Sequence, residues 1–172
     1  LELEGGGPAA ARNAGVAAAT GDAVAIVDAD DLADPRRLLL EERVLAGDPA
    51  VDGVAAGMEN FVSPDCPPEV VVRLDFPRGP VPGWHAGTLL LRADPLERGG
   101  PFDETLRGGE VIDWLHRARS AGLRLELLGE VLLRRRVHGS NITIVQRATL
   151  GGGYLDTARA AIARRRALED AS

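Results

Sequence analysis

Three aspartates stand within four positions of this sequence, directly after a short apolar run. Residues 23–27 are predicted to form one buried strand, and Asp28, Asp30 and Asp31 follow it. Carboxylates this close repel one another unless a cation or open solvent relieves the repulsion. An Asp-X-Asp pair at a strand end can direct two carboxylates to one point and hold Mg²⁺ or Mn²⁺. An acidic turn that caps the next helix explains the triplet equally well.

The elements around this triplet alternate between helix and strand. Apolar periodicity and glycine stops predict helices over 5–21, 32–47 (with a Leu/Val stripe), 110–122 and roughly 143–168. Strands are predicted over 23–27, 51–62, 87–94 and 124–139, the last as one strand or a pair. This alternation indicates an α/β fold with a mostly parallel sheet flanked by helices. Ligands bind such sheets at the carboxyl ends of strands, where the aspartates lie.

Length and composition limit the class of protein. At 172 residues and 18.1 kDa, we expect a single domain over 1–172, whose residues 143–172 form a C-terminal helical segment. The net charge of −6 argues against nucleic acid as a partner. A single cysteine, Cys66, excludes an internal disulfide and a thiolate zinc site. No apolar run reaches the ~18–20 residues of a membrane span, so we expect a soluble, cytoplasmic protein.

Four segments, taken in order, resemble the family 2 glycosyltransferases of the GT-A fold. They are GGGPAAARNAG, DADDLADPRRL, FDETLRGGEVIDWLHRARSAGL and LLRRRVHGSN, and together they cover about residues 4–142. The resemblance implies a GT-A-like sheet and a metal-dependent, inverting glycosyltransferase. Such an enzyme moves a sugar from a nucleotide-diphosphate donor (a UDP-, GDP- or dTDP-sugar) to an acceptor hydroxyl. The acceptor itself is not specified by the resemblance.

The resemblance also implies roles for individual residues. Asp28 and Asp30 match the family's Asp-X-Asp motif and would contact the ribose and the metal, Mn²⁺ or Mg²⁺, of the donor. His138 matches a histidine that completes the metal site, with a solvated loop histidine as the alternative. The segment that approaches the nucleotide is matched by Gly6, Gly7, Arg12 and Asn13. An ordinary lead-in to a packed helix would explain that segment as well.

The catalytic base is expected at the start of the helix over 110–122. Family members commonly carry Glu-Asp there, whereas Glu110 is followed by Val111 in this sequence. Asp113 lies one helical turn on, on roughly the same face. Either carboxylate could take the proton of the acceptor hydroxyl, and we place Glu110 ahead of Asp113. The departure at Val111 leaves an inactive or differently tuned enzyme as an open alternative.

The acceptor is expected near the long Gly/Pro-rich loop over 63–83. Trp84 could stack on a sugar face, although a tryptophan is more often simply packed. His85 could contact a phosphate or have no role in binding.

Family members normally begin with a strand, a helix and a second strand ahead of the glycine segment. The resemblance therefore implies a fold that is N-terminally truncated here, without the first nucleotide-binding strands. Exposed sheet edges would then favour a homo-oligomer. The main alternative function is a non-catalytic GT-A-like domain or fragment that acts in assembly or partner binding. A metal-dependent nucleotidyl or phosphoryl transferase would share the clustered aspartates, but the Arg-Asn and GGEVIDW segments fit it less well.

Overall fold

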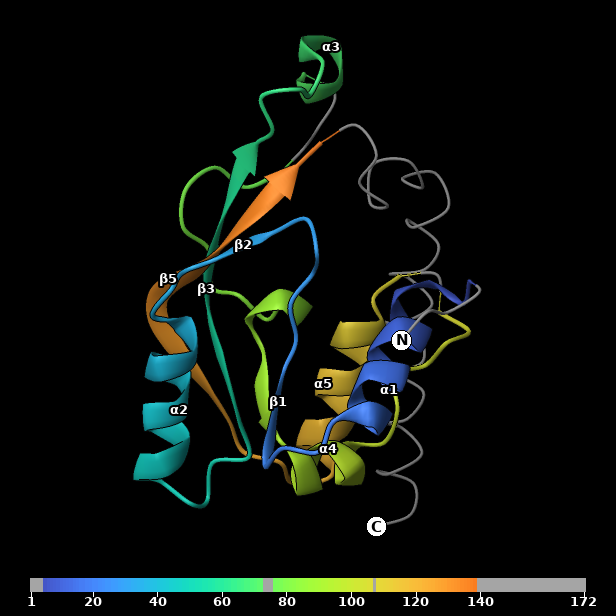
Figure 1. The fold of residues 1–172 in the computed structure, drawn as a ribbon, viewed down its shortest axis with the longest axis vertical. Coiled ribbons are helices and arrows are strands. Elements are labelled where there is room, and N and C mark those ends of the chain that lie inside the picture. Colours follow the sequence, from blue (N-terminus) through green and yellow to red (C-terminus); the bar gives the residue numbers. More distant parts are fainter. Residues whose placement is uncertain (1–4, 73–75, 107, 139–172) are drawn as a thin grey trace, which may run out of the picture.

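The computed structural model describes residues 5–72, 76–106 and 108–138 (Figure 1). These residues form a five-stranded sheet with helices packed on it, in the strand order β1-β4-β3-β5-β2. The strands are β1 (Ala23–Ala25), β2 (Leu32–Ala33), β3 (Gly53–Val62), β4 (Leu90–Arg92) and β5 (Leu125–Val137). The helices are α1 (Gly7–Ala18), α2 (Arg37–Gly47), α3 (Pro68–Val71), the short 3₁₀ helix η1 (Ala86–Thr88), α4 (Ala93–Gly99) and α5 (Glu110–Ser120).

The sheet is mixed rather than mostly parallel. β3 and β5 run parallel along their length, from the Gly53–Leu125 pair to the Val62–Val137 pair. The pairings β1–β4, β3–β4 and β2–β5 are antiparallel. The α/β class with flanking helices is confirmed, and the parallel order is corrected. A buried apolar run is typical of a parallel strand, but it carries no information on the direction of its neighbours.

Strand β1 is shorter and more exposed than predicted. It ends at Ala25, and among the described residues it pairs only with β4, at the edge of the sheet. Ile26 is buried, but the side chain of Val27 is 54% exposed. The apolar run over 23–27 therefore leads from an edge strand into the aspartate loop, and it is not one buried strand.

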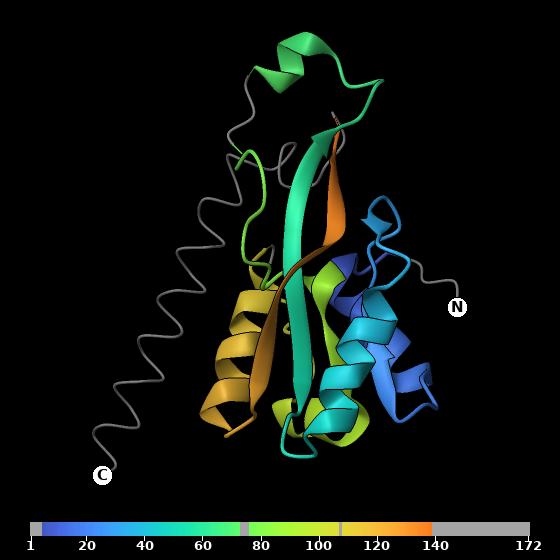
Figure 2. The same ribbon diagram turned by 90° about the vertical axis from the view of Figure 1, so that its left-hand side faces the viewer.

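The helices lie on both faces of the sheet. Figure 2 shows α2 and α5 on opposite sides of β3 and β5. Two separate apolar clusters match these faces: one gathers around α5, and the other joins α2 to the start of β3. The sheet therefore has an apolar cluster on each face, and the aspartate loop follows its edge strand β1.

Trp114 anchors the α5 side of the core. Its side chain is fully buried, its indole N–H donates to the carbonyl of Gly100 at 2.9 Å, and its ring packs against that of Phe102. A Cβ at Gly99 would lie only 2.9 Å from the Trp114 ring, so α4 and α5 meet where only glycine fits. This packing sets the start of α5, which carries Glu110.

The predicted helix over 143–168 and the C-terminal segment 143–172 lie outside the described residues. Within 5–72, 76–106 and 108–138, no helix has the length and apolar character needed to cross a membrane.

Candidate functional site

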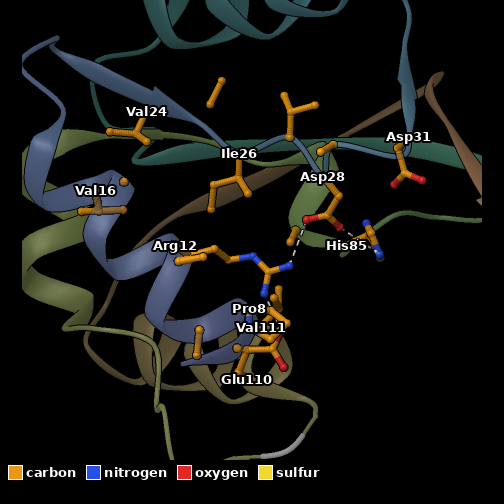
Figure 3. A pocket seen from close by; sticks show the side chains of 18 of the residues that line it. Pro8, Arg12, Val16, Val24, Ile26, Asp28, Asp31, His85, Glu110 and Val111 are labelled. Carbon is orange, nitrogen blue, oxygen red and sulfur yellow. Dashed lines mark hydrogen bonds and ion pairs between the residues drawn. The ribbon is translucent and has the colours of Figure 1, made fainter. Parts of the chain in front are cut away.

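A cavity of about 1350 Å³ opens at the carboxyl end of β1 (Figure 3). Its walls come from the start of α1, from β1 and the loop after it, from the segment before η1, and from the start of α5. The predicted site residues that line it are Gly6, Gly7, Arg12, Asp28, Asp30 and Glu110. Asn13, Asp113 and His138 are not among its lining residues.

Glycines form the entry to α1 for a conformational reason. Gly6 and Gly7 have φ values of 98° and 75°, in the left-handed region that favours glycine. A Cβ on Gly6 would also lie 2.8 Å from the Cβ of Ala10. Pro8 follows in the first turn, where its missing N–H costs nothing. The chain therefore presents bare backbone to the cavity before the helix begins.

Arg12 joins two carboxylates across the cavity (Figure 3). Its guanidinium donates to Oδ1 of Asp28 at 3.0 Å and to Oε1 of Glu110 at 2.5 Å. The Arg12 side chain is only 13% exposed, so these contacts form in a setting that screens charge less than open water does. The Arg12 side chain thus links α1, the aspartate loop and α5.

Asp28, Asp31 and His85 form a group that could hold a metal ion. One ligand atom from each residue lies within 4.8 Å of those of the other two. Burial raises the pKa of Asp31, and the nearby charges of Asp30 and Asp28 raise it further, although the backbone N–H of Arg136 opposes the shift. A divalent cation would relieve this repulsion, and carboxylate oxygens are the ligands that Mg²⁺ and Mn²⁺ prefer.

The ring of His85 is oriented by the backbone. Its Nδ1 accepts the N–H of Gly87 at 3.2 Å and so caps η1. In the neutral ring the proton is then on Nε2, which lies 4.0 Å from Oδ2 of Asp28, too far for a hydrogen bond. Burial lowers the pKa of His85, although the charge of Asp28 opposes this. This tautomer suits donation to an anionic oxygen better than metal ligation through Nε2.

Asp30 is paired with His138. The Nε2 of His138 lies 2.9 Å from Oδ2 of Asp30, and this hydrogen bond is the main cause that lowers the pKa of Asp30. The Arg136 side chain also donates to the backbone carbonyl of Asp30. The metal set predicted from the sequence therefore lies in two neighbouring groups: Asp28 with Asp31 and His85, and Asp30 with His138.

The two candidate bases have different surroundings. Glu110 lines the cavity, and its side chain is 15% exposed. Asp113 is buried, and its Oδ2 accepts from Nε of Arg117 at 2.8 Å. Arg117 also donates to the backbone carbonyls of Gly99 and Pro101. Asp113 thus helps to fasten α5 to the chain around α4, and of the two carboxylates only Glu110 lines the cavity.

Asn13 holds α1 in place. Its side-chain amide donates to the carbonyl of Phe102 at 2.9 Å, and its Oδ1 accepts the N–H of Phe102 at 2.8 Å. The same amide donates to Glu104. Through these hydrogen bonds the side-chain amide of Asn13 joins α1 to the segment that leads into α5.

Val111, at the position of the usual second carboxylate, packs into the core beside the cavity. Its side chain is 8% exposed and belongs to the apolar cluster around Trp114. A carboxylate in this setting would need a partner to offset its desolvation. The departure from the family pattern therefore fits the local packing.

Trp84 lies between the main cavity and a smaller one of about 550 Å³. The guanidinium of Arg119 lies 4.3 Å from the centre of the Trp84 ring. Trp84 and Ile112 line both cavities, so the two cavities adjoin at the start of α5.

Sequence reasoning did not assign Asp31 to the site, and it left His85 open between a phosphate contact and no role in binding. Asp31 was visible as the third member of the acidic triplet. His85 comes next to Asp28 only because β1 and β4 pair side by side, and no local pattern predicts that pairing.

Comparison with known proteins supports the resemblance. Residues 1–57 match the family model described as Glycosyl transferase family 2. Two curated proteins named pre-mycofactocin glycosyltransferase, from Mycobacterium tuberculosis strains CDC 1551 / Oshkosh and ATCC 25618 / H37Rv, are 35% identical over 137 residues. The match covers 69% of this chain, which spans 28% of the length of these relatives.

Solved structures of similar fold include S. aureus TarS 1–349. Its complex with UDP-GlcNAc has a TM-score of 0.62 and 19% identity, over 82% of this chain and 42% of that one. Its complex with UDP has a TM-score of 0.58 and 20% identity, over 80% of this chain and 42% of that one. This likeness confirms the predicted GT-A-like fold.

Proposed function

Because the chain resembles the family 2 glycosyltransferases in both sequence and fold, we propose that it transfers a sugar from a nucleotide-diphosphate donor to an acceptor hydroxyl. The observation that carries the proposal is the bridge made by Arg12. It brings Asp28, expected at the donor, and Glu110, expected at the acceptor, to one cavity. The TarS structures are complexes with UDP-GlcNAc and with UDP, which supports testing a UDP-sugar before GDP- and dTDP-sugars.

Metal dependence is part of the proposal, because the acidic residues fit a divalent cation. Asp28 and Asp31 supply hard oxygen ligands within reach of one another, and Mn²⁺ or Mg²⁺ would be held there, with Asp30 of the same loop as a further predicted ligand. When bound, the ion would act as a Lewis acid toward the leaving diphosphate. His138 stays a predicted ligand, and its contact with Asp30 places it next to that loop.

Glu110 would act as the base. Its carboxylate takes the proton of the acceptor hydroxyl while the hydroxyl oxygen attacks the anomeric carbon. The new carbon–oxygen bond forms on the face opposite the diphosphate, whose bond to the anomeric carbon breaks, so one displacement inverts that centre. Arg12 keeps Glu110 turned toward the cavity, and the Nε2–H of His85 is available to a phosphate oxygen.

The acceptor would approach along Trp84, which lines both cavities. The curated relatives are named for pre-mycofactocin, so that compound is the first acceptor to test. The location in the cytoplasm stays a prediction.

A non-catalytic binding domain is the second candidate. The observation that favours it is the buried Val111 at the position of the usual second carboxylate. A chain of this kind would bind nucleotide without transferring sugar.

Thermal unfolding with Mn²⁺, with and without UDP, GDP and dTDP, tests the proposal. A ligand that binds only the folded state adds about 2.7 kcal/mol of stability at ~100 times its dissociation constant. We expect a nucleotide shift that needs Mn²⁺ and is lost in Asp28→Asn. The control is Asp22→Asn, an exposed aspartate just before the other end of β1. A folded wild-type protein that shifts with none of the nucleotides would refute the donor site.

A further inference from the structure

Helix α2 buries charge and exposes leucine. The α2 side chains that are buried are Arg37, Glu41 and Leu45, one turn apart, with Arg37 1% and Glu41 0% exposed. Leu38 and Leu39 of the same helix are 54% and 50% exposed. A helix that only packed against the sheet would bury the leucines instead.

The two buried charges form a close ion pair. Nε of Arg37 lies 3.0 and 3.2 Å from the two carboxylate oxygens of Glu41. Such a pair is often no more stable than apolar residues of similar size, because both ions lose their water. Burial raises the pKa of Glu41, and the charge of Arg37 opposes this. Packing alone does not explain why the pair is there.

The rest of the Arg37 guanidinium reaches the backbone behind the candidate site. Nη1 donates to the carbonyl of Ile26, and Nη2 donates to the carbonyl of Leu89, each at 3.1 Å. Ile26 lies two residues before Asp28. Leu89 follows η1, whose N-cap is His85.

These carbonyls lie where the β1–β4 ladder stops. The ladder covers Ala23–Ala25 against Leu90–Arg92, and one further bond joins the N–H of Ile26 to the carbonyl of Leu89. Beyond that bond, the Arg37 side chain donates to both segments and so joins them.

We propose that Arg37, oriented by Glu41, is a positioning residue for the donor site and sets the spacing between Asp28 and His85. This inference rests on the proposed function for its ligand-binding consequence. The effect of Arg37 on the spacing between Asp28 and His85 is expected in the ligand-free protein as well. Arg37 does not line the cavity, so its effect reaches a ligand only through the two backbone segments.

Replacing the pair by apolar residues of similar size separates positioning from packing. In Arg37→Met/Glu41→Leu the core stays filled, but the carbonyls of Ile26 and Leu89 lose the guanidinium that joins them, while Leu89 keeps its bond from the N–H of Ile26. We expect an unfolding midpoint equal to or above that of the wild type. Affinity for Mn²⁺ with UDP, measured by calorimetry, should fall about 10–100-fold, as for other groups that orient metal ligands.

The matched control is Arg43→Met/Glu42→Leu. It makes the same two changes of residue type at exposed positions of α2, so affinity should stay at the wild-type value. Should the apolar double variant fail to fold, Arg37→Lys is the second variant. Lysine keeps the charge beside Glu41 but lacks the planar fork that reaches two carbonyls, so affinity should again fall.

A ligand-free readout keeps the two proposals distinguishable. Imidazole ¹⁵N NMR of His85 should show the Nε2–H tautomer in the wild type and a changed ring signal in the apolar double variant. Unchanged ring signals together with unchanged affinity would overturn the role of Arg37. A changed ring signal in a protein whose wild type binds neither Mn²⁺ nor nucleotide would support that role and refute the proposed function.

Discussion

At the scale of single residues, the site depends on which charges meet. Arg12 contacts both Asp28 and Glu110, and a guanidinium can serve two carboxylates at once because its donors point in several directions. Asp113, on the same helix as Glu110, is instead occupied by Arg117. Two carboxylates one turn apart therefore have different contacts, and substituting each of them should affect a different set of measured properties.

We predict different signatures for Glu110→Gln and Asp113→Asn. Glu110→Gln should lower the transfer rate about 10²–10⁴-fold because the base is lost. It also weakens the ion pair with Arg12, so its unfolding midpoint should fall as well. Asp113→Asn should lower the free energy of unfolding by about 1–3 kcal/mol, because the ion pair with Arg117 is weakened. Donor hydrolysis or transfer assays and urea denaturation measure the two effects. A rate loss confined to Asp113→Asn would exchange the assigned roles.

The second prediction at this scale concerns pH. Burial lowers the pKa of His85 below its ordinary 6.5, so the unfolded chain binds this proton more tightly than the folded one. Stability from this group is present above pH 6.5 and is lost as the pH falls from there through the lowered pKa. Protonation would also remove the acceptor that Nδ1 offers to Gly87.

The comparison is between wild type and His85→Asn, whose side-chain oxygen can still cap η1. Unfolding midpoints at pH 7.5 and 5.5 should fall further for the wild type than for the variant. An equal fall of the unfolding midpoint in the wild type and the variant would show that His85 does not contribute to the acid sensitivity.

At the scale of elements, prediction from sequence worked where the signals are local. The helices α1, α2 and α5 and the strands β3 and β5 form within the segments predicted for them, because periodicity and glycine stops act within a few residues. The buried face of α2 was not predictable in this way. Its Leu/Val stripe suggested a buried apolar face, whereas Arg37 and Glu41 are inside, bonded to chain far away in sequence.

Helix α1 offers a matched pair of glycines for a prediction. Gly6→Ala should be destabilising by about 1–3 kcal/mol, since its φ is 98° and the new Cβ would clash with Ala10. Gly15→Ala should be stabilising by roughly 0.5–1 kcal/mol, because this site is helical and a Cβ there meets nothing within 4 Å. Thermal unfolding of both variants checks the signs. A stabilising Gly6→Ala would mean that α1 does not begin at a left-handed residue.

At the scale of the whole molecule, the described residues leave apolar surface at the β1 edge. β1 and β2 are the outer strands of the sheet, and Val27 is 54% exposed beside the aspartate loop. Exposed edges and apolar patches favour association. A homo-oligomer therefore stays a prediction, and the β1 edge is the surface expected to form its contact.

We expect sedimentation to show a molecular mass that rises with concentration. Val27→Thr should weaken this association, since it keeps the branched shape of the side chain and adds a hydroxyl. Val72→Thr is the control, because Val72 is also exposed but lies beyond the end of β3. A mass equal to one chain at all concentrations, or equal effects of both variants, would exclude the β1 edge as the contact.

The sequence by itself determined the α/β class, the family resemblance and the presence of carboxylates at the end of an apolar run. Those features depend on residue type and short spacing. Only the tertiary structure decided the direction of the strands and the link from Arg12 to Glu110 across 98 positions. The family resemblance had already assigned Asp30 and His138 to one site, and the structure adds their direct contact. It also decided that His85, and not His138, lies beside Asp28. Contacts over such separations arise from how the sheet and helices pack, and no local pattern in the chain encodes them.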